Sequence, residues 1–376
     1  MRILHSGTLD TAAGGPAMST YYTLLGLRRL GLEAEILMYP LSPGGVLRGQ
    51  EVPVHYTPAP WEKKFAYSPV YKRNMRALGE FDIYHAQGIW QYPTYALADV
   101  AQERQKPYLI TPHGMLYPQD IAKSNKRLKR LSLKLRLLHD LNRAACVHVT
   151  CREEMEHVRH LGATSPVAVI SNPVEIKIHP EEKQDSIFRL GYLGRLSPRK
   201  NVEGLLYAFA ALRDMSSKAE LLIIGGGDAK YEQFLRAEAK RLELDNVRFT
   251  GFLSGQAKDA ALASLSVLAM PSEFENFGMV ITEGLIRGIP CIATTGSPWE
   301  ELRTEDCGWW VPYSQQSLTE AVKEALQTPE ERLRQMGERG RRLVENRYSV
   351  EVVAGQMAAL YEWILGKREQ PEFVYK

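Results

Sequence analysis

Several features that mark common classes of protein are scarce or missing in this chain of 376 residues. No apolar run approaches the roughly 20 residues that a membrane-spanning helix needs. Only four cysteines are present, Cys146, Cys151, Cys291 and Cys307, and their spacing is not that of metal ligands. We therefore expect these cysteines to be buried free thiols in a reducing compartment.

An excess of charge of one sign is also lacking. The chain carries 47 Lys and Arg against 44 Asp and Glu, and a net charge of +3 is too small to indicate a nucleic-acid partner. Residues 1–7 have the pattern of a short strand followed by glycine, and not that of a signal peptide. We therefore expect a cytoplasmic protein of about two globular domains that does not bind nucleic acid.

Short apolar strands and helices alternate twice along the chain, which predicts two doubly wound α/β domains. The strands expected in the first half are 2–5, 33–38, 81–85, 108–111, 146–150 and 167–170. Those expected in the second half are 188–193, 220–224, 247–250, 265–270, 291–294 and 309–311. The polar segment 172–186 contains two prolines and no hydrophobic period, so it predicts an interdomain linker. Thr150-x-x-Glu153 is typical of a capping box that opens the following helix.

Two glutamates, Glu275 and Glu283, lie eight positions apart at the junction of an expected strand and an expected helix. Glu275 follows strand 265–270, and Glu283 lies about one turn inside helix 279–287. Ligands of open α/β sheets bind at the carboxyl ends of the strands, where a helix N-terminus favours phosphate. Two carboxylates beside a phosphate suit the hydroxyls of a sugar and a ribose. The alternative is that Glu275 caps the helix and Glu283 is a solvated helical residue.

Two further loops have the residue types of a phosphate site. The loop 194–201 follows the first strand of the second half and carries Arg195 and Lys200. A guanidinium fork and an ammonium charge suit a diphosphate leaving group, although a solvated basic loop has the same composition. The pair Gly14 and Gly15 lets the backbone approach a phosphate, or forms a plain flexible turn. The pair is not the fingerprint Gly-x-Gly-x-x-Gly, which argues against a nicotinamide enzyme.

The two longest motifs occur together in a recognisable order. Gly194-Arg195-Leu196-x3-Lys200, and then Glu275-x7-Glu283 with Phe-Gly after the first glutamate, resemble the signatures of a glycosyltransferase family. This family contains the retaining nucleotide-sugar glycosyltransferases of family 4 (glycosyl transferases group 1), including bacterial surface-polysaccharide enzymes. The resemblance implies the α/β GT-B fold, in which two Rossmann-like domains face each other across a cleft.

The resemblance also implies the domain limits and the roles of the main motifs. Residues 1–173 would form the acceptor-side domain and 174–349 the nucleotide-sugar domain, with a C-terminal helix of about 350–376 packing back on the first. Arg195 and Lys200 would stabilise the diphosphate, Glu275 would hold donor-sugar hydroxyls and Glu283 the ribose. Backbone N–H groups near the helix start would assist, and these belong to Phe277, Gly278, Met279 and Val280.

Shorter motifs fit the same resemblance. His113 matches a His-Gly position that forms a wall of the donor-sugar site, and Asn172 matches a turn beside the cleft. Gly226 and Phe252 match positions on the donor side, and the Gly14-Gly15 loop would close over the diphosphate. Each of these motifs, taken alone, is also ordinary turn chemistry, and a lone histidine is more often structural.

Two features complete the comparison with the family. The loop 296–301, Gly-Ser-Pro-Trp-Glu-Glu, departs from the Gly-Gly pair that many members have. The chain also lacks an Asp-x-Asp pair, so we expect catalysis without a metal. No cofactor is expected apart from the nucleotide-diphospho sugar as co-substrate.

The segment 120–143 carries eight Lys or Arg and two Asp. On a helical wheel Leu128, Leu131, Leu135 and Leu138 form one stripe, whereas Leu133 and Leu137 fall among the basic residues. The segment is either a surface helix packed through that stripe or a patch attracted to anionic lipid near a lipid-linked acceptor. Trp90 is either an acceptor-site aromatic or a core residue.

The sequence therefore predicts a retaining glycosyltransferase that uses a nucleotide-diphospho sugar, expected to be UDP-linked. The acceptor would be a saccharide or lipid-linked saccharide in cell-surface polysaccharide synthesis. The enzyme would be cytoplasmic, and peripheral on the inner face of the membrane if 120–143 binds lipid. Two alternatives stay open: a sugar-nucleotide epimerase, and a catalytically silent nucleotide-binding or membrane-associated scaffold.

Overall fold

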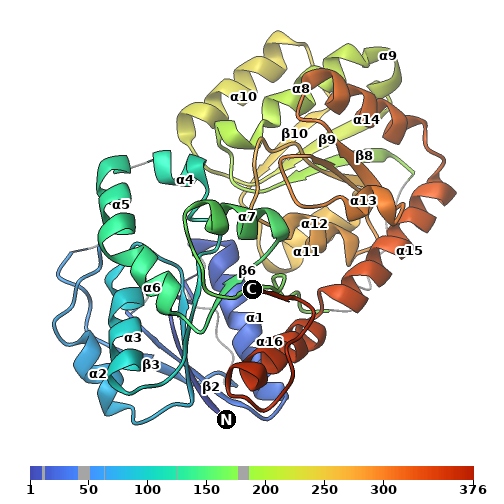
Figure 1. Ribbon diagram of the computed structural model, residues 1–376. Coiled ribbons are helices and arrows are strands. Elements are labelled where there is room, and N and C mark those ends of the chain that lie inside the picture. Colours follow the sequence, from blue (N-terminus) through green and yellow to red (C-terminus); the bar gives the residue numbers. More distant parts are fainter. Residues whose placement is uncertain (11–12, 41–50, 63, 124, 177–185) are drawn as a thin grey trace. The chain divides into compact units, whose positions relative to one another are not determined.

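The computed structural model describes residues 1–10, 13–40, 51–62, 64–123, 125–176 and 186–376 (Figure 1). The chain divides into two compact units: the first unit contains Met1–Glu175 and Ser349–Lys376, and the second unit contains Ile176–Tyr348. Residues 177–185 of the expected linker lie outside the described residues. None of the helices in the described ranges is long and apolar enough to cross a membrane.

The first unit is built on an eight-stranded sheet with the order β14-β7-β6-β5-β4-β1-β2-β3. Its strands are β1 (Arg2–Ser6), β2 (Glu33–Met38), β3 (Val54–Tyr56), β4 (Ile83–Gln87), β5 (Tyr108–Thr111), β6 (Cys146–Val149), β7 (Val167–Val169) and β14 (Val374–Tyr375). The short β14 pairs antiparallel with β7, whereas the other neighbouring strands pair in parallel. The strand order reverses between β1 and β4, and such a switch point is where open sheets bind ligands.

Helices cover both faces of this sheet because successive strand residues point to opposite sides. In β1, Ile3 packs on the side of α1 (Gly15–Arg29) and α16 (Val350–Ile364), whereas Leu4 packs on the side of α2 (Tyr71–Ala77) and α3 (Tyr92–Glu103). A Cβ atom on Gly26 of α1 would lie 2.6 Å from Cβ of Ala354 in α16. The C-terminal helix therefore packs closely against the first helix of the unit.

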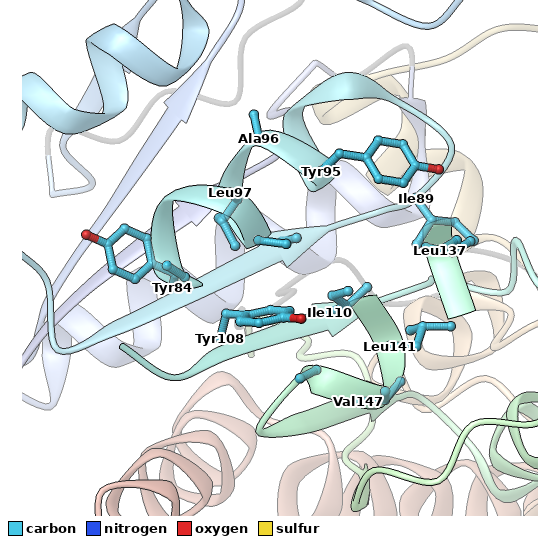
Figure 2. Close-up of a cluster of buried hydrophobic side chains, with 14 of the residues drawn as sticks. Tyr84, Ile89, Tyr95, Ala96, Leu97, Tyr108, Ile110, Leu137, Leu141 and Val147 are labelled. Carbon is cyan, nitrogen blue, oxygen red and sulfur yellow. The ribbon is translucent and has the colours of Figure 1, made fainter. Parts of the chain in front are cut away.

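Figure 2 shows the core on the α3 side of the sheet. Tyr84 of β4, Val147 of β6 and Leu97 of α3 belong to one buried cluster. Leu137 and Leu141 join the same cluster. Burial of Leu137 and Leu141 holds the segment 120–143, from here on the cationic segment, against the domain.

The cationic segment forms α4 (Pro118–Lys123), α5 (Lys126–Ser132), the π-helical turn η2 (Leu133–Leu137) and α6 (Leu138–Arg143). The expectation that this segment packs through the stripe of Leu128, Leu131 and Leu135 is wrong, whereas the alternative, a patch attracted to anionic lipid, stays a prediction. The side chains of Leu128, Leu131 and Leu135 are 66, 53 and 73% exposed, whereas Leu133 and Leu137 are 9 and 0% exposed. The wheel separates these two sets correctly, but the side that packs is the opposite one, which carries Leu133 and Leu137.

The predicted capping box is also displaced by one residue. Helix α7 (Arg152–His160) begins after Cys151, so the third helical position is Glu154 and not Glu153. The buried carboxylate of Glu154 accepts hydrogen bonds from the backbone N–H (2.9 Å) and the hydroxyl (3.1 Å) of Thr150. The helix start is thus tied to the preceding strand end by a residue that the motif did not include.

The second unit is built on a six-stranded parallel sheet with the order β10-β9-β8-β11-β12-β13. Its strands are β8 (Phe188–Leu193), β9 (Ala219–Ile224), β10 (Val247–Gly251), β11 (Val267–Met270), β12 (Cys291–Thr294) and β13 (Gly308–Val311). In chain order this arrangement is 3-2-1-4-5-6, the Rossmann order, with its switch point between β8 and β11. The predicted fold class, two parallel α/β domains, is confirmed.

Helices again lie on both sides of the sheet (Figure 1). The second unit contains α8 (Val202–Ala211), α9 (Arg213–Ser216), α10 (Ala229–Arg241), α11 (Gly255–Ala263), α12 (Met279–Leu285), α13 (Glu301–Thr304), α14 (Gln315–Gln327) and α15 (Glu330–Arg347). Helices α8, α10 and α14 share one buried cluster with strand residues such as Leu190 and Tyr192. On α12, a Cβ atom at Gly284 would lie 2.7 Å from Cδ2 of Leu268 in β11, so this helix lies tightly on its strand.

Candidate functional site

Lys200 and Glu275 meet at the switch point of the second unit. Lys200 ends a short 3-10 turn (Pro198–Lys200) after β8, and Glu275 lies in the loop between β11 and α12. The Lys200 ammonium group donates to the Glu275 carboxylate, and the two side chains are 21 and 11% exposed. The contact joins two loops through residues that are 75 positions apart in the sequence.

The loop after β8 is held in place by a hydrogen bond from Tyr192, a residue of that strand. Its hydroxyl donates to the carbonyl oxygen of Arg195 (2.9 Å), while the side chain of Arg195 is exposed. Burial raises the pKa of Tyr192, and the negative charge of Glu275 raises this pKa further. The neutral phenol therefore lies near the Glu275 carboxylate and fixes the backbone that presents Arg195.

The turn that carries Glu275 is supported by the loop that departs from the family pattern. The backbone N–H of Glu275 donates to the carbonyl oxygen of Gly296 (2.7 Å), and the indole N–H of Trp299 donates to the carbonyl of Phe277. Trp299 is fully buried, and its ring centroid lies 5.3 Å from that of Phe277. Sequence reasoning missed this supporting role because the contact joins positions 22 residues apart.

Gly278 starts the next helix in a conformation that favours glycine. Its φ is 80°, and a Cβ atom there would lie 2.8 Å from Sδ of Met270. Met279 and Val280 are the first residues of α12, so their N–H groups have no partner inside the helix. The N–H of Ile281 donates to the carbonyl of Gly278 (2.9 Å).

Glu283 is held by a different cation from the one that holds Glu275. Its carboxylate forms an ion pair with Lys258 of α11, and both side chains are 28% exposed. The guanidinium of Arg287 donates to the backbone carbonyl of Glu283 (2.9 Å) and to the carboxylate of Asp259. The two glutamates of the motif thus have separate lysine partners.

The glycine turn after β9 lies against the loop after β8. A Cβ atom at Gly225 would lie 1.9 Å from the carbonyl oxygen of Gly194, and one at Gly227 would lie 2.2 Å from that of Leu196. A Cβ atom at Gly226 would meet no atom within 4 Å. The close backbone approach therefore requires Gly225 and Gly227, while the predicted donor residue Gly226 faces open space.

Phe252 follows β10 and is 81% exposed. The preceding Gly251 has a φ of 74°, which turns the chain at the end of the strand. An exposed aromatic ring at a strand end offers a flat surface for stacking, and the role of this position on the donor side stays a prediction.

In the first unit, His113 lies at the ends of β4 and β5. Its Nε2 atom contacts Oε1 of Gln87 (2.9 Å), and its backbone has a φ of 52°. Burial lowers the pKa of His113 to about 3, and His148 adds a smaller effect of the same sign. The neighbouring N–H of Gly114 donates to the Glu154 carboxylate. His113 is therefore a neutral imidazole on a turn that Glu154 anchors.

Trp90 lies on the adjacent turn and is half-buried. Its φ is 69°, which is unusual for a bulky residue and indicates local backbone strain. The indole N–H donates to the carbonyl of Met115 (3.2 Å), and the Lys129 ammonium lies 5.6 Å from the ring centroid. Trp90 thus packs on the core and also links the turn to the cationic segment.

The remaining predicted residues surround the start of α1. Gly14 is the N-cap with a φ of 68°, and Gly15 is the first helical residue. Asn172 is buried, and its Oδ1 atom accepts a hydrogen bond from the hydroxyl of Ser19 (2.6 Å). This contact ties the second turn of α1 to the segment that follows β7.

The cysteines and potential metal ligands offer no further centre. All four cysteines are buried and none of them forms a disulfide bond, as expected. Burial raises the pKa of Cys151 to about 11 and that of Cys146 to about 12, so both thiols stay protonated near neutral pH. Across the ranges that the structure describes, no group of three or more His, Cys, Asp or Glu side chains could hold a metal ion.

Comparisons with known proteins match both halves of the chain. The family model described as glycosyl transferases group 1 matches residues 174–343, and the glycosyl transferase 4-like domain matches residues 14–173. A GDP-mannose-dependent alpha-(1-6)-phosphatidylinositol dimannoside mannosyltransferase of Mycobacterium tuberculosis is 30% identical over 205 residues. That match covers 52% of this chain and 51% of the relative, so the chain spans about half the length of the curated relatives it matches.

Solved structures resemble the chain over nearly its full length. HepE of Anabaena in complex with UDP has a TM-score of 0.78 at 19% identity, covering 96% of this chain and 100% of that one. Sucrose-phosphate synthase of Thermosynechococcus elongatus has a TM-score of 0.76 at 20% identity, covering 97% of this chain and 99% of that one. At these identities the likeness establishes the fold.

Proposed function

The chain belongs to the glycosyl transferases group 1 family and has its GT-B fold, and from this membership we propose that it is a retaining glycosyltransferase. It would move a sugar from a nucleotide-diphospho sugar to a saccharide or lipid-linked saccharide in cell-surface polysaccharide synthesis. The observation that carries the proposal is the contact of Lys200 with Glu275 at the switch point of the second unit. The contact supports the proposal because Lys200 would serve as the cation for the diphosphate and Glu275 as the carboxylate for sugar hydroxyls.

The proposed donor site uses the four charged residues of the two motifs. Lys200 supplies a point charge and Arg195 an exposed planar fork, and both suit the oxygens of a diphosphate. Glu275 accepts hydrogen bonds from hydroxyls of the donor sugar, and Glu283 accepts them from the ribose. The N–H groups at the start of α12, from Gly278 to Val280, add donors for phosphate oxygen.

The proposed reaction needs charge stabilisation more than a nucleophilic side chain. The acceptor oxygen forms a bond to the anomeric carbon on the same face from which the diphosphate oxygen departs. The electron pair of the broken bond stays on the diphosphate, which takes the proton of the acceptor hydroxyl. Arg195 and Lys200 stabilise the growing negative charge, and their two positive charges would serve where other glycosyltransferases use a divalent metal.

For the acceptor, we propose a lipid-linked saccharide that is reached at an anionic membrane surface. The exposed Leu128, Leu131 and Leu135 project from a segment rich in Lys and Arg. An open groove of about 870 Å³ lies beside them and is lined by apolar residues such as Leu116 and by cations such as Arg130. Apolar side chains among cations suit the interface of a membrane that contains anionic lipid. The protein would then act as a cytoplasmic, peripheral enzyme.

The first experiment is a thermal-shift screen with UDP, GDP, ADP and their common sugar conjugates. A ligand that binds only the folded protein raises the melting temperature by mass action. The sequence predicts a UDP-linked donor, whereas the mannosyltransferase relative is named for GDP-mannose. The screen therefore has to include both UDP and GDP. No shift with any diphosphate would contradict the proposed donor site.

Turnover then separates the proposal from its two alternatives. The nucleotide sugar that raises the melting temperature is incubated with the protein, with and without lipid-linked saccharides, and the products are examined by NMR. A product that keeps the anomeric configuration of the donor supports retaining transfer, and unchanged turnover in EDTA supports catalysis without a metal. An isomer of the donor formed without acceptor would favour an epimerase, and an intact donor with every acceptor would favour a scaffold.

Membrane binding is tested separately, by sedimentation with vesicles of phosphatidylcholine alone or with added phosphatidylglycerol. We expect binding to the anionic vesicles only, and loss of binding in the triple variant Leu128→Ser, Leu131→Ser, Leu135→Ser. The control replaces the exposed cations Lys230 and Lys240, on α10, by Gln. Equal binding of wild type to both kinds of vesicle, or of the triple variant to the anionic ones, would contradict the membrane proposal.

A further inference from the structure

Buried histidines and two hydroxyl groups form a continuous hydrogen-bonded chain inside the first unit. Eight residues take part and are joined by seven hydrogen bonds, in the order Ile170, His148, Thr111, His85, Tyr361, His5, Gln87 and His113. They come from the strand ends β1, β4, β5, β6 and β7 and from α16. One end of the chain is a backbone carbonyl, and the other end is the candidate site residue His113.

The carbonyl end decides which atom donates at every following link. A carbonyl oxygen only accepts, so Nε2 of His148 carries the hydrogen and donates to Ile170 O (2.8 Å). Burial lowers the pKa of His148 to about 4, so the ring is neutral and its Nδ1 atom accepts from the Thr111 hydroxyl (2.9 Å). The single hydroxyl hydrogen of Thr111 is already donated to His148. The Thr111 oxygen therefore accepts a hydrogen bond from Nε2 of His85 (2.7 Å).

The same reasoning continues through α16. Burial keeps the pKa of His85 well below its usual value, so its Nδ1 atom accepts from the Tyr361 hydroxyl (2.7 Å). The Tyr361 oxygen then accepts from Nε2 of His5 (3.3 Å), and Nδ1 of His5 accepts from the Gln87 amide (3.0 Å). Oε1 of Gln87 is left to accept from Nε2 of His113 (2.9 Å). The orientation of the Gln87 amide agrees with the polarity derived from the far end.

We propose that this chain fixes His113 as the tautomer with hydrogen on Nε2 and a lone pair on Nδ1, and that Tyr361 of α16 is the positioning residue that sets this polarity. Nδ1 then offers an acceptor for a ligand hydroxyl and disfavours a phosphate or carboxylate oxygen at the same point. The choice of a sugar or acceptor hydroxyl as ligand rests on the proposed function, whereas the tautomer does not.

Among the described residues, the Tyr361 hydroxyl joins the part of the hydrogen-bonded chain from Ile170 to His85 to the part from His5 to His113. This hydroxyl contacts both Nδ1 of His85 and Nε2 of His5, and the residue is fully buried. Without that hydroxyl, the segment from His5 to His113 loses its connection to the carbonyl end. The Gln87 amide can then rotate by half a turn and donate to His113, which places the hydrogen on Nδ1 instead.

The test is an NMR measurement on the protein of residues 1–376, without added ligand and labelled with ¹⁵N at its nine histidines. His113→Gln assigns the His113 signals by their loss. We expect a single Nε2–H tautomer of His113 at pH 7 in the wild type, and a second set of ring signals from the Nδ1–H tautomer in Tyr361→Phe. A wild-type Nδ1–H tautomer, or an unaltered single tautomer in folded Tyr361→Phe, would overturn the proposal.

A second break in the chain protects the test against misfolding. Thr111→Val removes the link between His85 and His148 and should release the same mixture at His113, whereas Thr111→Ser keeps a hydroxyl and should restore the single tautomer. The matched control is Tyr108→Phe, because Tyr108 is buried and its hydroxyl donates to the carbonyl of Asp140 (2.6 Å) outside the chain. The same tautomer mixture in Tyr108→Phe and Thr111→Ser would mean that general loosening is the cause, and would overturn the proposal.

These results are independent of turnover. If donor transfer fails but the tautomer is as expected, the proposed function is wrong and the inference about His113 holds. If transfer occurs while His113 has the Nδ1–H tautomer, the inference fails and the proposed function holds.

Discussion

The ammonium group of Lys200 contacts the carboxylate of Glu275 between the loops that follow β8 and β11. The cation proposed for the diphosphate is thus paired with the carboxylate proposed for the donor sugar. A diphosphate that reaches Lys200 would provide a second anionic partner and release Glu275 toward hydroxyl groups. The pair therefore acts as one element, and the effects of its substitutions should not add.

The first prediction concerns Lys200→Ala. We expect turnover to fall by about 100-fold or more, the scale on which loss of one preorganised stabilising group acts. The fold should survive, since Lys200 lies on a partly exposed loop turn. Initial-rate kinetics with the donor found by thermal shift measure the effect, and the exposed Lys240→Ala serves as control. Turnover within about a factor of two of wild type would remove Lys200 from its assigned role.

The coupling of this pair is a separate prediction. If Lys200 and Glu275 act together, the double variant Lys200→Ala, Glu275→Ala should lose little more activity than the more damaged single variant. A double-mutant cycle on kcat/KM measures this. Fully multiplicative losses would show that the two residues act independently.

Glu283 is predicted to contribute to nucleotide binding more than to the chemical step. A hydrogen bond to a charged group is worth about 1.5–3 kcal/mol, so Glu283→Gln should weaken nucleotide binding about tenfold or more while kcat changes less. Isothermal titration with the nucleoside diphosphate and its 2′,3′-dideoxy analogue is the measurement. Wild type should prefer the hydroxylated ligand, and Glu283→Gln should lose that preference. Equal discrimination by both proteins would exclude ribose as the partner of Glu283, and Glu300→Gln on the exposed surface is the control.

The glycine turn after β9 separates folding from binding. Gly227→Ala would place Cβ 2.2 Å from the carbonyl of Leu196, so we expect a large loss of stability, whereas Gly226→Ala meets open space. The Gly226 variant should keep its free energy of unfolding within about 0.5 kcal/mol of wild type, as surface substitutions usually do. If Gly226 approaches the donor, the same variant should bind nucleotide more weakly. Denaturant unfolding and titration of both variants decide the matter, and unchanged binding in Gly226→Ala would remove it from the donor site.

The sequence predicted the strands and the site loops well because these depend on local signals. An apolar run that stops at Pro271 or Gly194 marks both the strand end and the place where a ligand loop begins. The positions of Arg195 and Glu275 relative to β8 and β11 follow from this punctuation. Whether these residues bind the donor is still a prediction.

The features that escaped prediction depend on contacts between residues that are distant in the sequence. Trp299 supports Phe277 through a hydrogen bond across 22 positions, and Glu154 anchors the turn at Gly114 across 40. The helical wheel grouped Leu131 and Leu135 correctly on one side, but the side that packs is the one that carries Leu133. Both sides of this helical segment carry leucine, so its own sequence does not decide which side the rest of the domain covers.

The buried histidines make the first unit sensitive to acid. Burial lowers the pKa of His5 to about 3 and that of His148 to about 4, and a histidine in an unfolded chain titrates near ~6.5. Below that pH the unfolded chain binds more protons than the folded one, so stability falls as the pH decreases toward the folded-state values. Each such histidine adds up to about 1.4 kcal/mol per pH unit to this slope.

His148→Gln provides the test, because glutamine can still donate to the carbonyl of Ile170 and accept from Thr111 without titrating. We expect this variant to be folded at pH 7 and to lose less stability than wild type between about pH 6 and pH 4, by about one histidine's share of the slope. Hydrogen exchange of the first-unit strands at a series of pH values reports the local free energy of opening. The exposed His160→Gln should retain the wild-type slope. If His148→Gln retains it as well, the acid sensitivity has another origin, and the neutral, buried state assigned to His148 would be contradicted.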